Sequence, residues 1–427
     1  MAHYSHAEIP VVTVSRRYAW IVFALTFGLL ISDYMSRQVL NAVFPLLKGE
    51  WLLSDAQLGS LSGIVALMVG LLTVPLSMLA DRWGRVKSLA LMALLWSVAT
   101  LACGLSESFE QMFAARFFVG IGEAAYGSVG IALVLSVFPP SLRATLTGAF
   151  MAGGMFGSVL GMALGGVLAE YLGWRWAFAG MAIFGILLAL VYPLLICEKK
   201  VAPQVKTVRQ QRPSMRGVVN SFSVLSAYIG SGLQLFVAAS FMAWIPSFMN
   251  RYYDMDTDKA GFVAAMFILI SGAGMVICGM LSDRLCRARA DRKIHLAIVY
   301  CLLCFVLLSI GFRLAPGSGQ LLLVAMGMFL AAGTTGPAGA MVANLTHPAI
   351  HGTAFATLTL VNNFLGLAPG PFVTGVLADE FGLSQALALV PLMSLASAAV
   401  FFYGKRHYQQ DIATEQQAPT SGETVAA

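Results

Sequence analysis

Long runs of apolar residues, separated by short polar segments, recur along the whole chain. A helix needs about 20 apolar residues to cross the hydrocarbon core of a bilayer, and the runs have about this length. Within them the apolar residues are continuous, as from Ile64 to Leu72 and from Leu89 to Leu95. The strands of a membrane barrel would instead alternate. The pattern predicts an all-α membrane protein with twelve transmembrane helices, at residues 19–43, 56–80, 87–105, 110–137, 143–169, 175–196, 220–249, 260–282, 294–312, 320–345, 351–377 and 384–403.

The composition explains why the bilayer is the natural solvent for this chain. Hydrophobic residues make up 58% of its 427 residues and charged residues 11%, whereas a soluble domain is about half apolar and about a quarter charged. So few charges cannot cover a water-facing surface, which excludes a soluble globular protein. No short apolar segment with a small-residue cleavage site follows the polar N-terminus, so we expect no cleaved signal peptide.

An internal repeat divides the chain into two halves. The segment Asp-Arg-Trp-Gly-Arg at 81–85 follows the second predicted span, and a related segment at 283–287 follows the eighth, 202 residues later. Gly-Val-Leu-Ala-Glu at 166–170 recurs 209 residues later as Gly-Val-Leu-Ala-Asp at 375–379. Because six helices separate equivalent positions, the halves have the same orientation, as in a parallel repeat about an axis along the membrane normal.

The repeat and the polar stretches also give the domain boundaries. We expect two pseudo-symmetric six-helix bundles, at residues 19–197 and 220–403. A cytoplasmic N-terminal segment at 1–18 precedes them, and a cytoplasmic linker at 198–219 joins them. The polar tail at 404–427 is expected to be disordered and cytoplasmic.

The basic residues predict the orientation. If the N-terminus is cytoplasmic, 19 of the 26 Lys and Arg residues fall in cytoplasmic segments and 5 in outer ones. The positive-inside rule therefore places both termini in the cytoplasm, and the short loops favour a bacterial inner membrane. The net charge of +6 is thus a topology signal and implies no nucleic-acid partner. We expect a monomer whose partners are its substrate and the membrane lipids.

Together with the twelve spans and the repeat, the segment 81–85 resembles the signature loop of the major facilitator superfamily, over residues 17–405. The resemblance implies transport by alternating access. A carboxylate in this loop can cap the positive N-terminal end of a helix in the other half, and its arginines can pair with acids or carbonyls, so that the loop closes a cytoplasmic gate. The alternative is a loop whose charges only set the topology. The residues expected in the gate are Asp81, Arg82, Gly84, Arg85, Asp283, Arg284 and Arg287.

Four ionisable residues lie well inside predicted spans, where they are costly and usually line a cavity. Asp33 and Arg37 are four residues apart, and Arg116 and Glu123 seven, so each pair shares one face of its helix. A buried carboxylate tends to take up a proton, and a nearby arginine opposes this uptake. We expect Glu123 to bind the coupling proton with help from Asp33, and the arginines to balance charge or hold an anionic substrate. The alternative is a permanent ion pair that only joins helices. The second half has no comparable buried charge, so adaptable substrate contacts are expected there.

Three segments resemble the spinster-like branch of the superfamily. They are Asp33-Tyr34-x-x-Arg37-Gln38-Val39-Leu40-Asn41, Leu53-Ser54-Asp55-x-Gln57-Leu58-Gly59 and Arg116-x3-Gly120-x-Gly122-Glu123-Ala124-x-Tyr126. Within them, Tyr34 and Tyr126 are further candidates for substrate contact. Eukaryotic members of that branch imply an amphipathic or lipid-like solute such as a lysolipid. The Arg-x6-Glu spacing also resembles organic-anion symporters, which are the second interpretation, followed by drug-type efflux.

The signature motifs of other functional classes are absent from the sequence. No P-loop is present to couple ATP, and no H-x-x-E-H or G-x-S-x-G motif indicates an enzyme. Cys301 and Cys304 lie inside an apolar span without a second ligand pair, so we expect no metal, no disulfide framework and no cofactor other than a coupling proton. A channel or a receptor is the alternative of another class, and coupling to a proton gradient would distinguish a transporter from both.

Overall fold

A computed structural model describes residues 14–201, 221–286, 292–346 and 350–417. Within these ranges twelve helical segments are long and apolar enough to cross a membrane, which confirms the predicted all-α fold. The helices are α1 (Arg16–Trp51), α2 (Asp55–Trp83), α3 (Arg85–Gly104), α4 (Phe109–Glu123), α5 (Tyr126–Val137), α6 (Arg143–Leu172), α7 (Trp174–Leu195), α8 (Glu198–Val201), α9 (Phe222–Tyr253), α10 (Thr257–Leu285), α11 (Arg292–Gly311), α12 (Ser318–Ala331), α13 (Thr335–Leu345), α14 (His351–Asn362), α15 (Pro369–Phe381), α16 (Leu383–Leu389) and α17 (Leu392–Gln417), with short 3₁₀ or π turns η1 (Pro140–Leu142), η3 (Ala332–Thr334) and η5 (Asn363–Leu367).

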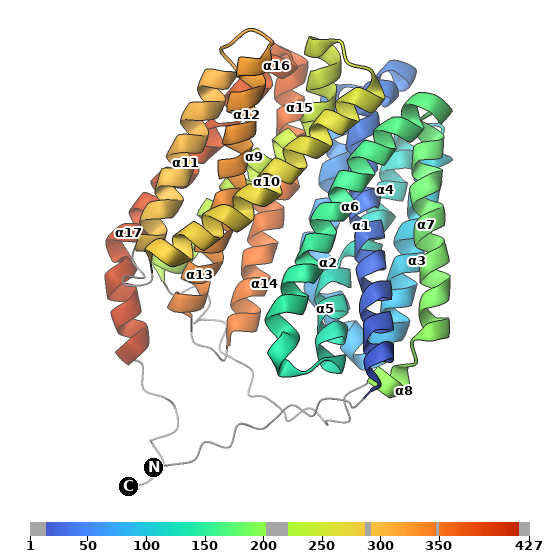
Figure 1. Ribbon diagram of the computed structural model, residues 1–427. Coiled ribbons are helices and arrows are strands. Elements are labelled where there is room, and N and C mark those ends of the chain that lie inside the picture. Colours follow the sequence, from blue (N-terminus) through green and yellow to red (C-terminus); the bar gives the residue numbers. More distant parts are fainter. Residues whose placement is uncertain (1–13, 202–220, 287–291, 347–349, 418–427) are drawn as a thin grey trace.

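The helices form two halves, α1–α7 and α9–α17, which lie side by side in Figure 1. Between the halves, α2 packs against α15 and α6 against α10. Glycines allow the backbones to approach closely, since a Cβ on Gly166 would lie 2.7 Å from the Thr257 carbonyl oxygen and one on Gly63 would lie 2.5 Å from that of Ala368. The inter-half interface is therefore built on backbone contact.

The turns at the helix ends also repeat between the halves. Gly173 joins α6 to α7 with a φ of 91°, and Gly382 joins α15 to α16 with a φ of 82°. These conformations favour glycine because it has no Cβ. The two glycines are 209 residues apart, which is the offset of the repeat around them.

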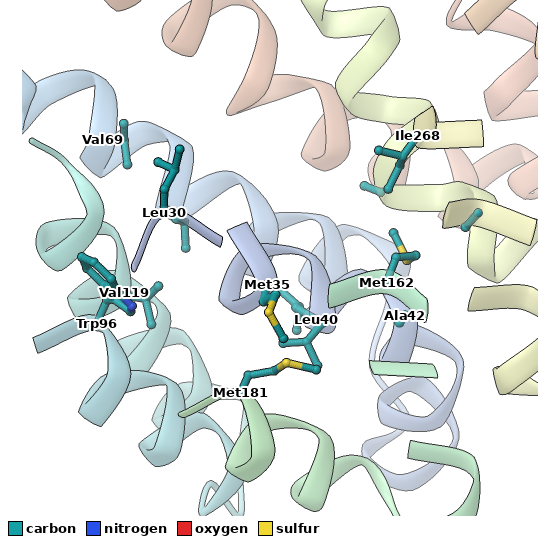
Figure 2. Close-up of a cluster of buried hydrophobic side chains, with 14 of the residues drawn as sticks. Leu30, Met35, Leu40, Ala42, Val69, Trp96, Val119, Met162, Met181 and Ile268 are labelled. Atoms are coloured by element: carbon teal, nitrogen blue, oxygen red, sulfur yellow. The ribbon is translucent and has the colours of Figure 1, made fainter. Parts of the chain in front are cut away.

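An apolar core holds the helices of the first half in register. Figure 2 shows Met35 and Leu40 of α1 with Met181 of α7, and Trp96 of α3 beside Val119 of α4. These side chains are buried. Because α1 and α4 also carry the ionisable residues, the core fixes where those charges lie.

The end of the last span differs from the prediction. Disorder is expected from residue 404, but α17 continues to Gln417. Asp411 ties this extension to the start of α9, because its Oδ2 accepts hydrogen bonds from the Ser221 hydroxyl and the Ser223 backbone N–H. Residues 1–13, 418–427 and most of the predicted linker, from residue 202, lie outside the described residues.

Candidate functional site

A cavity of about 240 Å³ lies between the two halves. Its first-half wall carries two arginines, a tyrosine and amide side chains, whereas its second-half wall is apolar. Within this lining, the charged side chains therefore all come from the first half. The lining consists of Tyr34, Arg37, Gln38, Asn41, Ser62, Val65, Ala66, Arg116 and Ser158 from the first half and Ala239, Met242, Ala243, Leu367 and Pro371 from the second.

Three of the predicted ionisable residues meet behind one wall of this cavity. The Nε of Arg37 lies 2.8 Å from the Oε2 of Glu123, and its Nη2 lies 3.5 Å from the Oδ1 of Asp33. The Arg37 side chain is 21% exposed and lines the cavity, whereas both carboxylates are buried. The Asp33 and Glu123 carboxyl groups also lie close enough to interact with each other. Arg37 is therefore the cation that both carboxyl groups share, with its shorter contact to Glu123.

The fourth charge, Arg116, is held differently. Its Nε donates to the Leu61 carbonyl at 3.2 Å and its Nη1 to the Ser36 carbonyl at 3.0 Å. Its side chain thereby ties α4 to α1 and α2. Arg116 lines the cavity but is only 1% exposed, so Arg37 is the more accessible cation.

The two predicted tyrosines have different surroundings. Tyr34 lines the cavity, and the Arg37 guanidinium carbon lies 5.2 Å from the centre of its ring. Tyr126 is absent from the cavity lining; its hydroxyl donates to the Thr26 carbonyl at 2.7 Å, and its ring packs edge-on against Trp96. The structure therefore gives Tyr126 packing contacts and leaves Tyr34 as the tyrosine within reach of a solute.

The fourth span is broken directly after Glu123. α4 ends at this residue and α5 begins at Tyr126. The break frees the Ala124 carbonyl, which accepts a hydrogen bond from the Thr73 hydroxyl at 2.7 Å. Broken helices are typical of transporter sites near the middle of the membrane, and this break places the Glu123 carboxylate at a helix end.

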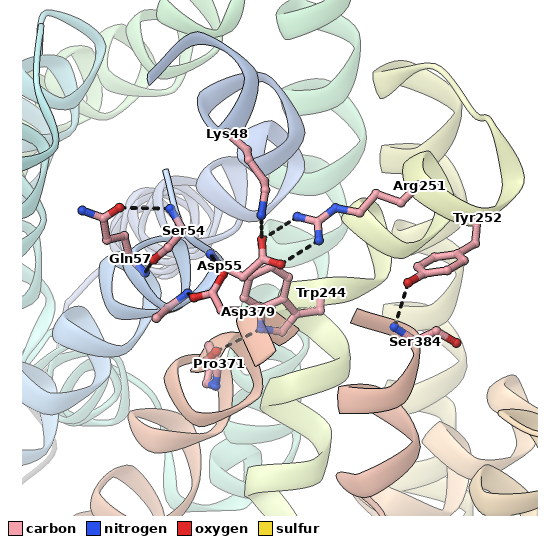
Figure 3. A network of polar contacts seen from close by, with 11 residues as sticks. Lys48, Ser54, Asp55, Gln57, Trp244, Arg251, Tyr252, Pro371, Asp379 and Ser384 are labelled. Atoms are coloured by element: carbon pink, nitrogen blue, oxygen red, sulfur yellow. Dashed lines mark hydrogen bonds and ion pairs between the residues drawn. The ribbon is translucent and has the colours of Figure 1, made fainter. Parts of the chain in front are cut away.

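A polar cluster that the sequence did not reveal closes one end of the interface. Figure 3 shows that Asp55 of α2 forms ion pairs with Lys48 of α1 and Arg251 of α9. The Lys48 Nζ lies 2.6 Å from Asp55 Oδ1, and both terminal nitrogens of Arg251 donate to the two Asp55 oxygens at 2.6 and 2.8 Å. Asp379 of α15 completes this Asp55 cluster by accepting from the backbone N–H groups of Asp55 and Ala56 at 2.7 and 2.8 Å. The cluster therefore joins the two halves twice, through Arg251 and through Asp379.

The repeat places an equivalent contact at the same end. Glu170 of α6 accepts a hydrogen bond from the Thr257 backbone N–H, at the start of α10, at 3.1 Å. Glu170 and Asp379 are the final acids of the two repeated segments. Each thus stabilises the N-terminal end of a helix in the opposite half, where a negative charge is favourable. The recurrence of an acid at the end of both repeated segments was a sequence signal for these two contacts. The glycines of the same segments indicate only that helices pack closely.

The predicted gate lies at the opposite end, which carries α8 and is called the linker end here. Asp81 pairs with Arg85 of its own loop at 3.1 Å and is 61% exposed. The N-terminal end of α3 is occupied by the Glu198 carboxylate, which accepts from the backbone N–H groups of Arg85 and Val86 at 2.8 Å each. Gly84, with a φ of 107°, leaves room for that carboxylate.

The second copy of the gate loop also forms its ion pair within its own half. Asp283 pairs with Lys293 at 3.1 Å, and Arg284 is exposed. Arg287 lies outside the described residues. Among the residues that the structure describes, the polar contacts between halves gather at the Asp55 cluster and Glu170, while the Asp81 loop contacts its own half.

Comparison with known proteins adds to this geometry. A family model described as Major Facilitator Superfamily matches residues 26–368 and 227–424. A probable L-galactonate transporter of Escherichia coli strain K12 is 24% identical over 430 residues, which cover 93% of each chain. The sphingosine-1-phosphate transporter SPNS2 of Danio rerio is 22% identical over 385 residues, covering 85% of this chain and 76% of the relative.

Solved structures share the fold. A bacterial homologue of the human lysosomal transporter Spinster, in an inward-facing and unoccupied conformation, superposes with a TM-score of 0.84 at 20% identity. The match covers 93% of this chain and 99% of that one. The resemblance found in the first and fourth spans is thus matched by similarity along nearly the whole chain.

Proposed function

Because the chain belongs to the Major Facilitator Superfamily, we propose that it is a secondary transporter that couples protons to the movement of a small organic anion by alternating access. One observation carries this proposal. Arg37 faces the central cavity while Glu123 neutralises it from behind, 2.8 Å away. The site therefore has one cation that can serve either an internal carboxylate or the carboxylate of a solute.

Charge balance supplies the coupling. With Asp33, Glu123, Arg37 and Arg116 all ionised, the site has no net charge. Binding an anion alone would leave a buried uncompensated charge, which costs several kcal/mol. Protonation of Glu123 releases Arg37 for the anion and keeps the net charge at zero. Proton and anion are thus favoured together and disfavoured separately, which is the thermodynamic requirement for symport.

The cavity favours a small polyhydroxy acid. Its volume of about 240 Å³ is below the roughly 300–1,000 Å³ typical of sites for drug-sized ligands. Asn41 donates to Gln38 at 2.8 Å, and its buried Oδ1 has no hydrogen-bond partner among the described residues. A substrate hydroxyl would satisfy this oxygen. The relative from Escherichia coli is named for L-galactonate, which combines a carboxylate with several hydroxyls.

The contacts at the two ends support alternating access. The Asp55 cluster and Glu170 hold the halves together at one end, and the Asp81 loop makes no such contact among the described residues. This describes a conformation closed at the Asp55 end. The opposite conformation would break the Asp55 cluster and engage the Asp81 loop with the second half. The positive-inside rule assigns the linker end to the cytoplasm.

A lysolipid is the second candidate substrate. The second-half wall of the cavity, including Ala239, Met242 and Leu367, is apolar and could receive the start of an acyl chain. The similarity to SPNS2 and to the Spinster homologue favours this class. Here Arg37 would bind the phosphate of the headgroup.

Flux into proteoliposomes tests the proposal and separates the substrates. A panel of sugar acids and a panel of lysolipids would be compared with and without an imposed pH gradient. We expect sugar-acid uptake that a gradient acid on the substrate side accelerates, and loss of this acceleration in Glu123→Gln. Glu110→Gln, which removes an exposed carboxylate from the same helix, is the matched control.

Three results would contradict it. Flux that ignores the gradient in the wild type would indicate a channel, and binding without flux would indicate a receptor. Full gradient-driven uptake by Glu123→Gln would remove Glu123 from the coupling role. Uptake restricted to the lysolipid panel would replace the first candidate substrate with the second.

A further inference from the structure

A second cavity lies on the outside of the first half, between α2, α3 and α4. Its volume is about 100 Å³, and its residues include Leu76, Leu79, Trp83, Ser88, Leu91 and Ile121. None of these lines the central cavity. Trp83 is 62% exposed and Leu91 56%, so this groove, called the α2–α3 groove, opens onto the surface that the bilayer covers.

One polar side chain in the groove has an unused hydrogen-bonding group. Ser88 is 5% exposed, and its hydroxyl has no hydrogen-bond partner among the described residues. A serine in a helix commonly donates to the carbonyl one turn earlier, but this one does not. A buried hydroxyl without a partner is unfavourable, so Ser88 has an open position for a ligand that brings a polar atom into an otherwise apolar groove.

Positive charge flanks the same place. Arg82 precedes Trp83 and Lys87 precedes Ser88, and both basic side chains are exposed. No ion pair of either is found within the described part of the chain, whereas the neighbouring Arg85 is paired with Asp81. The cations therefore lie at the linker end of the groove, next to a tryptophan, a residue that prefers the headgroup level of a membrane.

We infer that the α2–α3 groove binds an anionic glycerophospholipid of the surrounding leaflet. Its phosphate lies between Arg82 and Lys87, Ser88 donates to an ester carbonyl, and an acyl chain follows Leu91 into the apolar part of the groove. The order of cation, hydroxyl and apolar surface along α3 matches the order of phosphate, ester and chain in the lipid. The complementarity of charge selects an anionic lipid over a zwitterionic one.

Binding at this position has a consequence for the gate loop. Arg82 and Gly84 belong to the segment expected to close the linker end, and Glu198 occupies the start of α3 beside them. A lipid phosphate at Arg82 and Lys87 would hold these cations in the leaflet and oppose their movement toward the second half. The membrane composition would then bias the conformation of the transporter.

Lipid binding to the purified full-length protein tests the inference without a transport assay. Native mass spectrometry and thermal unfolding would be followed while phosphatidylglycerol or phosphatidylcholine is added to the detergent-solubilised protein. We expect phosphatidylglycerol to bind and stabilise preferentially. The variant Arg82→Gln/Lys87→Gln should weaken its apparent affinity by about fivefold for each basic residue removed. Leu91→Trp, which fills the groove, should reduce binding of the same lipid.

The matched control carries the same charge change at the equivalent loop. Arg284→Gln/Arg292→Gln removes two exposed cations from the second half and should retain the preference. Equal affinity of the wild type for both lipids would overturn the inference, as would a preserved preference in Arg82→Gln/Lys87→Gln. Equal losses in both double variants would indicate general electrostatic attraction instead of a site. None of these outcomes affects the proposed transport function, because the inference requires only that the helices span a membrane.

Discussion

At the scale of single residues, the two buried arginines show how partners decide a role. Arg37 is held by carboxylates and faces the cavity, whereas Arg116 is held by the Leu61 and Ser36 carbonyls and is shielded. A carbonyl cannot take up a proton, so the bonds of Arg116 do not change with protonation. Those of Arg37 do. The sequence treats the two arginines alike because spacing alone does not identify the partner.

Conservative substitution should therefore affect a different property at each arginine. Arg37→Lys keeps the charge but loses the planar fork that binds a carboxylate, and we expect uptake to fall about 10- to 100-fold with little change in thermal stability, since a charged hydrogen bond contributes about 1.5–3 kcal/mol. Arg116→Lys should instead destabilise the protein by about 1–3 kcal/mol because a buried carbonyl loses its donor. Uptake and thermal unfolding of both variants would be measured together. A normal rate in Arg37→Lys would disprove the assigned contact.

The tyrosines give a second residue-scale prediction. Tyr126→Phe removes the hydrogen bond to the Thr26 carbonyl and should reduce the unfolding free energy by about 1 kcal/mol while the KM for substrate stays unchanged. Asn41→Ala should raise KM, because Asn41 lines the cavity with a free carbonyl oxygen. Concentration-dependent uptake separates the two effects. A raised KM in Tyr126→Phe would return Tyr126 to the binding site.

At the scale of helices, the contacts between the two halves depend on glycines. A Cβ on Gly261 of α10 would lie 2.8 Å from the Met162 carbonyl oxygen of α6, whereas nothing lies within 4 Å of one on Gly279 of the same helix. Gly261→Ala should push α6 and α10 apart near the Asp55 end, and Gly279→Ala should be neutral or slightly stabilising, as alanine favours helix. Spin labels on α6 and α10 would measure the separation. Equal distances in the two variants would show that this contact does not close the interface.

The helix scale also shows what hydropathy can predict. All twelve spans were predictable, because each must be apolar to lie in lipid. The first span is predicted from hydropathy to end at residue 43, but α1 continues to Trp51 in the structure. Hydropathy detects only the part of a helix that lies in lipid, and α1 extends beyond that part through Lys48 and Glu50. The break after Glu123 was not predictable, because Ala124 and Ala125 are good helix formers.

The candidate site was predictable in part for a similar physical reason. A charge inside an apolar span is conspicuous, so Asp33, Arg37 and Glu123 could be found from the sequence, and the structure brings them together. A charged residue at the end of a span cannot be distinguished by sequence from the charged residues of an ordinary loop. The Asp55 cluster could not be inferred, because its members are separated by up to 331 residues, from Lys48 to Asp379, and gain meaning only when the halves pack together.

At the scale of the whole molecule, the two ends determine which side the cavity faces. The Asp55 cluster lies at one end of the interface, and Phe44 of α1 packs on Trp244 of α9, whose indole donates to the Pro371 carbonyl beside the cavity. On α1, the aromatic pair and the cluster follow the cavity-lining residues Gln38 and Asn41 toward the Asp55 end. Since the Asp55 side chain is only 3% exposed while it pairs with Arg251 and Lys48, removing its charge leaves two cations without their partner.

Asp55→Asn should therefore shift the population toward the conformation open at the Asp55 end. Asp55→Asn removes the one buried carboxylate that two partly exposed cations share, whereas Asp379→Asn, which weakens a helix cap, should have a smaller effect of about 1 kcal/mol. A cysteine at Ala243, which lines the cavity, would report access to a membrane-impermeant maleimide, in a background where the exposed native Cys197 is replaced by serine. Labelling from the outer side of oriented vesicles should increase at least tenfold in Asp55→Asn.

The control for this experiment lies at the same end of the molecule. Asp256 pairs with Lys259 while 58% exposed, and exposed pairs contribute little, so Asp256→Asn should leave labelling unchanged. If Asp55→Asn labels like the wild type, the cluster does not hold the interface closed. If labelling rises only from the inner side of the oriented vesicles, the membrane orientation assigned from the basic residues is reversed. Asp55→Asn thus tests which end of the interface is closed, whether the Asp55 ion pairs hold it closed, and which side of the membrane that end faces. This follows because alternating access requires the cavity to open on the other side when the contacts at one end are lost.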